Sequence, residues 1–169
     1  MIEPSYVQMM ARYNRWQNEQ LMPVLQAMPA EELSKDRGAF FGSLLGTANH
    51  LLWGDTIWMS RFDPSVAPPA VAAADNTKLH PTIQSWATDR VRMDGHITLW
   101  AEGLRAADLL GDLDWTSGLL KTDMRAPMAT AVTHFFNHQT HHRGQIHMML
   151  TAAGQTAPVT DLIFLPEDT

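Results

Sequence analysis

The sequence has 169 residues, no cysteine and a formal net charge of -6 at pH 7. Its length is typical of one domain, expected over residues 1–169, and the missing thiols exclude disulfides and cysteine metal ligands. Negative charge without a basic cluster argues against a nucleic-acid partner. Because no segment resembles a signal peptide or a membrane span, we expect a soluble, cytoplasmic protein with no membrane partner.

Two amphipathic helices are expected in the first third of the chain. The first begins at Pro4, a residue suited to a first helical turn, and its apolar pattern continues to Met28, before Pro29 ends it. The second follows an N-cap at Ser43. It ends near Asp63, because a residue that precedes proline resists helical backbone angles.

A long proline-rich connection over residues 63–81 leads to the third helix. Pro81 is expected at the start of this helix. Its apolar stripe is expected to consist of Ile83, Trp86, Val91, Met93, Ile97, Leu99, Trp100 and Leu104. Residues 108–126 differ from the rest, because turn residues there separate short mixed runs. The sequence is compatible in this region with a short hairpin as readily as with a loop.

The fourth helix carries five of the eight histidines. We expect it from Pro127 to Ala153, with Gly154 as a natural C-cap. The tail that follows is too apolar for a free end and is expected to pack back on the helices. Four amphipathic helices with one long connection predict an all-α four-helix bundle.

Helical periodicity selects a pair among these histidines. At about 100° per residue, His142 falls inside the apolar face and His138 at its edge, whereas His134, His141 and His147 point elsewhere. Two histidines at i, i+4 can converge on one ion, but two imidazoles rarely hold it firmly, so a metal site needs a third ligand. The residues alone leave a second interpretation open, in which the histidines only form an exposed polar face.

His50 is the leading candidate for the third ligand. It lies in the middle of the second helix among apolar residues, where an unpaired polar ring would be costly to bury. The small neighbours Gly46 and Gly54 would leave room beside it. Its orientation stays open, because the second helix is apolar over most of its circumference. His80 and His96 are expected at the surface.

Further polar residues have structural as well as functional interpretations. Asp55 falls in an apolar stripe and is expected to be buried and paired, either near the histidines or in a structural pair with Arg143 or the first helix. Asn14 and Gln17 would serve the site as donors or make contacts between helices. His134 is a possible accessory group. Arg143 is otherwise expected at the surface or in a dimer contact.

Four segments together resemble the DinB family, the damage-inducible DinB/YfiT-like metal-binding proteins: YNRWQNEQL, ANHLLWGDTIWMSRF, FNHQTHHRGQIHMMLTAAG and TDLIFLP. The resemblance spans nearly the whole chain and is most specific in the HHRGQ run and the upstream NH. It implies an up-down-down-up four-helix bundle that often dimerises and holds one divalent metal ion, commonly nickel or zinc. Carried over by motif, the metal ligands are His50, His138 and His142.

Three neutral imidazoles leave a bound ion an open position, which suits activation of water or of a thiol. Because relatives in the wider superfamily use low-molecular-weight thiols, the resemblance implies a metal-dependent transferase or hydrolase acting on an unknown small molecule. The alternative is a non-catalytic bundle with a structural ion, which a fourth ligand such as His134 or Asp55 would favour. No catalytic residue is identified. Eleven methionines and six tryptophans favour a homodimer.

Overall fold

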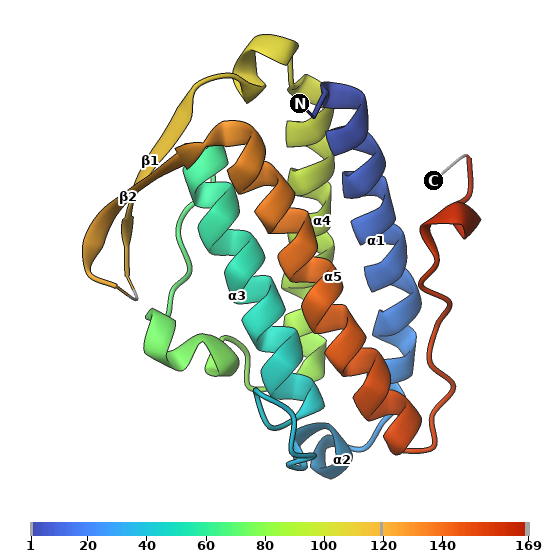
Figure 1. Cartoon of the computed structure of the whole chain (residues 1–169). Helices are drawn as coiled ribbons and strands as arrows, with labels where there is room; N and C mark the ends of the chain where they lie inside the picture. The colour runs from blue at the N-terminus through green and yellow to red at the C-terminus, as the bar shows by residue number, and fades with distance from the viewer. Residues whose placement is uncertain (1, 119, 168–169) are drawn as a thin grey trace.

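In a computed structural model, which describes residues 2–118 and 120–167, four long α-helices lie side by side (Figure 1). They are α1 (Pro4–Gln26), α3 (Leu44–Phe62), α4 (Ile83–Gly103) and α5 (Met128–Ala152). The colour gradient shows that α1 and α5 run in one direction and α3 and α4 in the other. The expectation of a mostly helical chain is confirmed.

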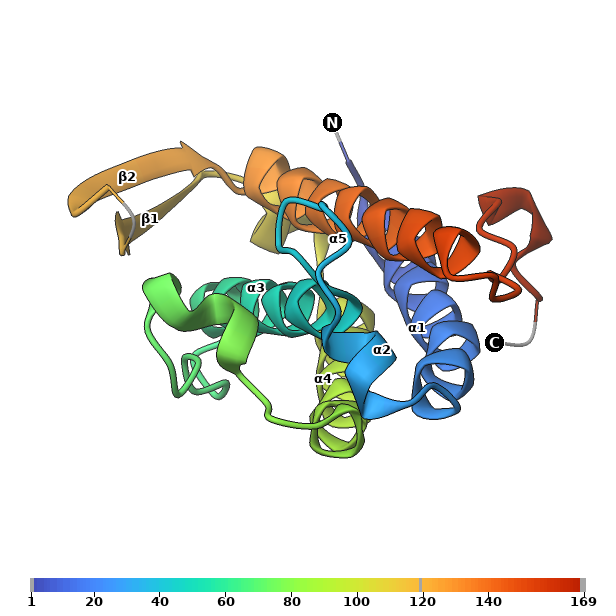
Figure 2. The same cartoon turned by 90° about the horizontal axis from the view of Figure 1, so that it is seen from below.

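Shorter elements connect and flank the long helices. They are α2 (Ala30–Ser34), the 3-10 helices η1 (Ala73–Lys78), η2 (Ala106–Leu109) and η3 (Leu162–Phe164), and the strands β1 (Asp112–Ser117) and β2 (Thr122–Pro127). The two strands form an antiparallel hairpin, as one of the two interpretations of this region predicts; Leu119 in the turn lies outside the described residues. In the view from below, the hairpin reaches beyond the ends of α3 and α5, and η1 lies beside α3 (Figure 2).

Side-chain caps begin two of the long helices. Ser43 begins α3 by accepting a hydrogen bond of 3.0 Å from the backbone N–H of Gly46, as expected for an N-cap. Thr82 does the same for α4 through the N–H of Ser85, so Pro81 lies just before the helix rather than in it. Among the described residues, no helix is both long and apolar enough to cross a membrane.

A network of buried charges joins the four long helices. Arg90 on α4 is 1% exposed, and its guanidinium lies 2.5 Å from Asp55 on α3 and 2.8 Å from Asp94 on its own helix. Asn14 on α1 donates to Asp94 and accepts a hydrogen bond from Arg143 on α5. The expectation that Asp55 is buried and paired is confirmed, but its partners are Arg90 and Gln139 rather than Arg143 or the first helix. Arg143 is buried as well, so its expected place at the surface is wrong.

The apolar stripe expected on α4 is confirmed only in part: Ile83, Trp86, Met93 and Ile97 are buried, but two of its residues are not. Val91 is 58% and Leu99 69% exposed, because the buried face of α4 is the one that carries Arg90 and Asp94. The buried face of α4 therefore combines apolar residues of the expected stripe with charged residues that the stripe leaves out. Charged residues belong to the core here because they pair with one another.

The tail after α5 lies along α1, as expected, but it is held through its backbone. Tyr13 donates a hydrogen bond of 2.5 Å to the carbonyl oxygen of Thr160, and Gln17 one of 3.0 Å to that of Val159. The apolar side chains of the tail face outward, with Ile163 85% exposed and Phe164 59% exposed. Packing of the tail thus does not hide its apolar side chains.

Candidate metal centre

His50 on α3 meets His138 and His142 of α5 between the two helices. The candidate ligand nitrogens of the three rings all lie within 4.8 Å of one another. The Nε2 atoms of His50 and His138 are 3.1 Å apart, and the ring centroid of His142 lies 4.6 Å from that of His50 and 4.4 Å from that of His138. The orientation of His50, which periodicity left open, is thus toward the pair on α5.

Two glycines of α3 permit this close approach. A Cβ atom at Gly54 would lie 2.7 Å from Cε1 of His138, so only a glycine leaves space for that ring. A Cβ atom at Gly46 would lie 2.7 Å from the carbonyl oxygen of Phe41, in the loop before α3. The absence of that Cβ lets the loop fold back, and the ring of Phe41 stacks on His50 with 3.8 Å between centroids.

Hydrogen bonds fix the orientation of two of the three rings. Nδ1 of His50 lies 2.9 Å from Oδ1 of Asn76, and Nδ1 of His142 lies 2.8 Å from Oε1 of Gln145. Because an amide oxygen only accepts, each Nδ1 carries the proton and donates it. The lone pair of each ring is therefore on Nε2. This is the arrangement in which protein histidines bind metals, with the second nitrogen bonded to a supporting group.

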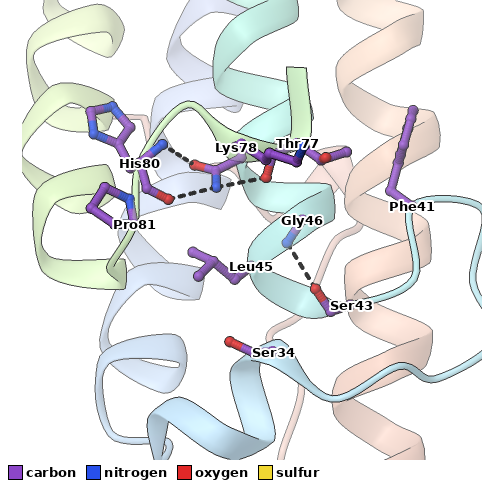
Figure 3. Close-up of a pocket in the computed structure, with 10 residues that line it drawn as sticks. Ser34, Phe41, Ser43, Leu45, Gly46, Thr77, Lys78, His80 and Pro81 are labelled. Atoms are coloured by element: carbon purple, nitrogen blue, oxygen red, sulfur yellow. Dashed lines mark hydrogen bonds between the residues drawn. The ribbon is translucent and has the colours of Figure 1, made fainter. Parts of the chain in front are cut away.

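Asn76 is itself placed by contacts between the connection and α3. Asn49 of α3 donates to the carbonyl oxygens of Thr77 and His80, at 3.0 and 2.9 Å, and accepts from the N–H of His80 (Figure 3). These bonds hold the end of η1 against α3. The His80 side chain is only 14% exposed, so its expected place at the surface is wrong, whereas His96 is exposed as expected.

Burial lowers the pKa of all three histidines. The pKa of His50 falls to about 4, mainly through burial and in part through the neighbouring His142. That of His138 falls to about 3, through burial and then through the proximity of His142 and His50. The pKa of His142 is also lowered, again mainly by burial. All three imidazoles are therefore neutral at pH 7, and each has a lone pair on one nitrogen.

The donor set fits one divalent ion. Two nitrogens that each lie 2.0–2.1 Å from a tetrahedral ion are about 3.3 Å apart, close to the 3.1 Å between His50 and His138. Within the described part of the chain, neither His134 nor Asp55 joins the group. The ring of His134 packs on Trp58 instead, with 5.1 Å between centroids, and Asp55 accepts from Arg90 and Gln139.

Comparison with known proteins agrees with the motifs. The model of the DinB family matches residues 1–169. The chain belongs to the DinB family. It is 26% identical over 153 residues to the protein DinB of Bacillus subtilis (strain 168), a match that covers 88% of this chain and 87% of that protein.

The fold is shared with a solved member of the DinB group. The crystal structure of a DinB-like protein from Bacillus cereus ATCC 10987 matches with a TM-score of 0.59 and 20% identity, over 85% of this chain and 90% of that one. At this level of identity the likeness concerns the fold alone. The resemblance expected from the four sequence segments is confirmed.

Sequence reasoning missed several residues around this DinB-family site. Asn76 lies in the connection and Phe41 in the loop before α3, where no periodicity predicts what a side chain touches. Gln145 lies three residues after His142, a helical spacing at which side chains meet, and this signal could have found it.

A cavity of about 640 Å³ also opens beside His50.

Proposed function

We propose that this chain binds one divalent metal ion through His50, His138 and His142 and acts as a metal-dependent enzyme on a small molecule. The observation that carries the proposal is the meeting of three neutral imidazoles, one of which, His50, also lines a cavity of about 640 Å³. A site that joins a metal ligand set to a cavity of this size is typical of enzymes rather than of structural ions.

The chain's own residues prepare the site for a ligand. Asn76 and Gln145 keep Nδ1 of His50 and His142 protonated, so that Nε2 of each ring is available. Phe41 covers one side of His50 and excludes water there. A divalent ion supplies Lewis acidity when bound, which lowers the pKa of a water or a thiol on its open side. Transfer to a thiol and hydrolysis are the two reaction classes that this chemistry supports.

The donor number favours an enzyme over a structural site. Structural zinc sites usually have four protein ligands, whereas three histidines leave a position for water or substrate. Both oxygens of Asp55 already accept hydrogen bonds, and His134 packs on Trp58. Nickel and zinc both suit imidazole ligands, and we propose one of them as the ion. A low-molecular-weight thiol is the proposed cosubstrate, because the chain has no cysteine of its own.

We further propose an up-down-down-up four-helix bundle that associates as a homodimer. The directions of the long helices, with α1 and α5 opposite to α3 and α4, support this order (Figure 1). The exposed side chains of Val159, Ile163 and Phe164 in the tail support a second copy of the chain as the partner that covers them. Sedimentation of the purified protein is expected to give twice the chain mass, and a species of 18.9 kDa at high concentration would contradict the dimer.

Elemental analysis of purified variants tests the metal site. The wild type is expected to carry about one divalent ion per chain, and His142→Ala far less, because two imidazoles bind weakly. His147→Ala is the matched control on the same helix and is expected to keep the ion. Equal metal in wild type and His142→Ala would refute the site.

Turnover tests the enzymatic part of the proposal. Thiol transfer from cysteine to 1-chloro-2,4-dinitrobenzene and hydrolysis of 4-nitrophenyl acetate are expected to be measurable for the metal-loaded protein. Both rates are expected to disappear in His142→Ala and after chelation, and to persist in His147→Ala. A fully loaded protein whose rates equal those of the chelated protein would instead support a structural ion.

A further inference from the structure

The cavity beside His50 extends away from the histidines along α3. It lies between α3, the connection that follows it and the β1–β2 hairpin, which stand around this region in Figure 1. His50 lines one part of it and Arg61, near the end of α3, another. The remaining wall is mainly aromatic and apolar, with Trp53, Ile57, Trp58, Val71, Trp115 and Met124.

His50 and Arg61 are the two basic residues that line the cavity, beside the polar residues Asn76, Thr116 and Ser117, and both stand on one face of α3. His50, Trp53, Ile57 and Arg61 follow one another at spacings of three and four residues, which places them along one side of the helix. With a rise of 1.5 Å per residue, His50 and Arg61 are roughly 16 Å apart along the axis. Helical side chains lean toward the N-terminus, so the guanidinium leans back toward the histidines. The space between them suits an elongated molecule.

Arg61 is a cation without an anionic partner in the part of the chain that the structure describes. Its guanidinium carbon lies 4.4 Å from the ring centroid of Trp58 and 5.5 Å from that of Trp115. No carboxylate of the described residues lies within 4.0 Å of it, in contrast to Arg37 and Arg90, which are each paired with an acid. Half-burial lowers the pKa of Arg61, yet a guanidinium stays charged at neutral pH.

Stacking on tryptophan accounts for only part of the guanidinium's binding capacity. A cation over an aromatic ring contributes about 0.5–2 kcal/mol, and this contact joins the hairpin to α3. The guanidinium also has five N–H donors, which lie in its plane. Within residues 2–118 and 120–167, none of these donors has a hydrogen-bond acceptor from the protein. They remain available to an anion in the cavity.

We propose that this cavity binds an elongated small molecule with an aromatic or apolar body and a terminal carboxylate, which Arg61 holds through paired N–H donors. A carboxylate accepts two parallel hydrogen bonds from one guanidinium, and tryptophan rings pack well on a flat apolar body. The end opposite the carboxylate then lies at His50. That the end at His50 reacts rests on the proposed function. The binding of the carboxylate at Arg61 does not need the metal ion.

Binding of two matched probes tests the carboxylate site. 4-Phenylbutyrate and its neutral amide have the same body and differ in charge at one end. Titration is followed through tryptophan fluorescence, because Trp53, Trp58 and Trp115 line the cavity. The wild type is expected to bind the carboxylate at least tenfold more tightly than the amide, as a charge-assisted pair predicts.

Variants of Arg61 assign this preference to the guanidinium. Arg61→Gln is expected to bind both probes equally and to keep the wild-type metal content. Arg61→Lys retains the charge and is expected to keep part of the preference, which provides a second measurement if the glutamine variant fails to fold. Arg92→Gln, an exposed arginine of α4 that pairs with Asp89, is the matched control and is expected to behave like wild type.

The outcomes separate this proposal from the metal site. Equal affinity of the wild type for the two probes, no binding of either, or an unchanged preference in Arg61→Gln would overturn the carboxylate site. His142→Ala is expected to lose its metal and still prefer the carboxylate. A metal-free wild type that prefers 4-phenylbutyrate would leave the carboxylate site standing while the proposed metal function fails.

Discussion

Gly54→Ala is the smallest change that reaches the histidine cluster. The added methyl group would lie 2.7 Å from Cε1 of His138 and 3.3 Å from its Nδ1. Gly54 lies within α3 and is buried, so the backbone has no room to retreat from α5. The imidazole of His138 is the end of a side chain and gives way first. We therefore expect the substitution to move this ring while leaving the fold intact.

The size of the displacement follows from the contact distance. An ordinary contact begins at 3.4 Å, so the ring must move by at least about 0.7 Å. Metal–ligand distances vary by only about ±0.2 Å around their preferred values. A ring displaced by more than that no longer matches His50 and His142, and we expect the metal affinity to fall roughly 10- to 100-fold, as when a supporting group is lost. Helix propensity acts in the opposite direction and adds about 1 kcal/mol of stability.

Metal titration and thermal unfolding of the same variant separate these two effects. Gly54→Ala is expected to unfold near or above the wild-type temperature without metal, and to bind metal more weakly. Gly95→Ala on α4 is the control, because nothing lies within 4 Å of the added Cβ and only helix propensity changes. Wild-type affinity in Gly54→Ala would refute the assignment of His138 as a ligand held against α3.

Two further predictions concern the supporting contacts and the pH. Asn76→Ala removes the acceptor for Nδ1 of His50, and titration calorimetry is expected to show 10- to 100-fold weaker metal binding; unchanged affinity would contradict the orienting role. The free energy of unfolding of the metal-free protein is expected to fall by roughly 2 kcal/mol per ring between pH 6.5 and 4. The folded-state pKa values of His50 and His138, about 4 and about 3, lie below the ordinary 6.5, so the unfolded chain binds more protons in this range. The raised pKa of Asp94, about 6, makes the folded protein more stable as the pH falls and so acts in the opposite direction. Urea unfolding of His138→Gln, in which Asp94 is unchanged, isolates the histidine contribution. An equal loss of stability at acid pH in the wild type and in His138→Gln would contradict it.

The same pKa values bear on the metal site itself. Free histidine loses its ability to bind metals as the pH drops through about 6.5, because the proton and the ion compete for one lone pair. With the pKa of His50 lowered to about 4, the proton competes less well. Metal binding is therefore expected to persist below pH 6 and to fade steeply only near pH 4. Burial thus prepares the cluster for binding without release of protons at neutral pH.

The pair on α5 could be predicted because helix geometry determines it. Residues at i and i+4 share a face in any α-helix, so the relation of His138 to His142 required no tertiary information. His50 is different, because α3 is apolar over most of its circumference and periodicity gives it no direction. Its neighbours made it the leading candidate for a third ligand, but only the family motif predicted that it joins the pair on α5. The residues that orient the rings, Asn76 above all, come from connections, whose course depends on packing.

Arg143 shows how residue type can mislead where periodicity would have succeeded. At 100° per residue it falls near 140° from His138, inside the apolar face of α5. The expectation of a surface position followed from its charge instead. Arg90 on α4 was missed for the same reason. A buried guanidinium is stable when its partners are buried with it, and such partners on other helices are not visible in a local sequence pattern.

Arg61 differs from these two buried arginines, because it has no partner of this kind among the described residues. Arg90 and Arg143 are buried, and each reaches a carboxylate or an amide oxygen on another helix. Arg61 is half-buried among tryptophans, where an unpaired charge costs stability, and within the described residues no acid compensates it. Trp115, about fifty residues further along the chain, completes its surroundings, so no local pattern could predict them. A stability requirement alone would favour an apolar residue in this aromatic wall, whereas an anionic ligand in the cavity gives the charge a partner.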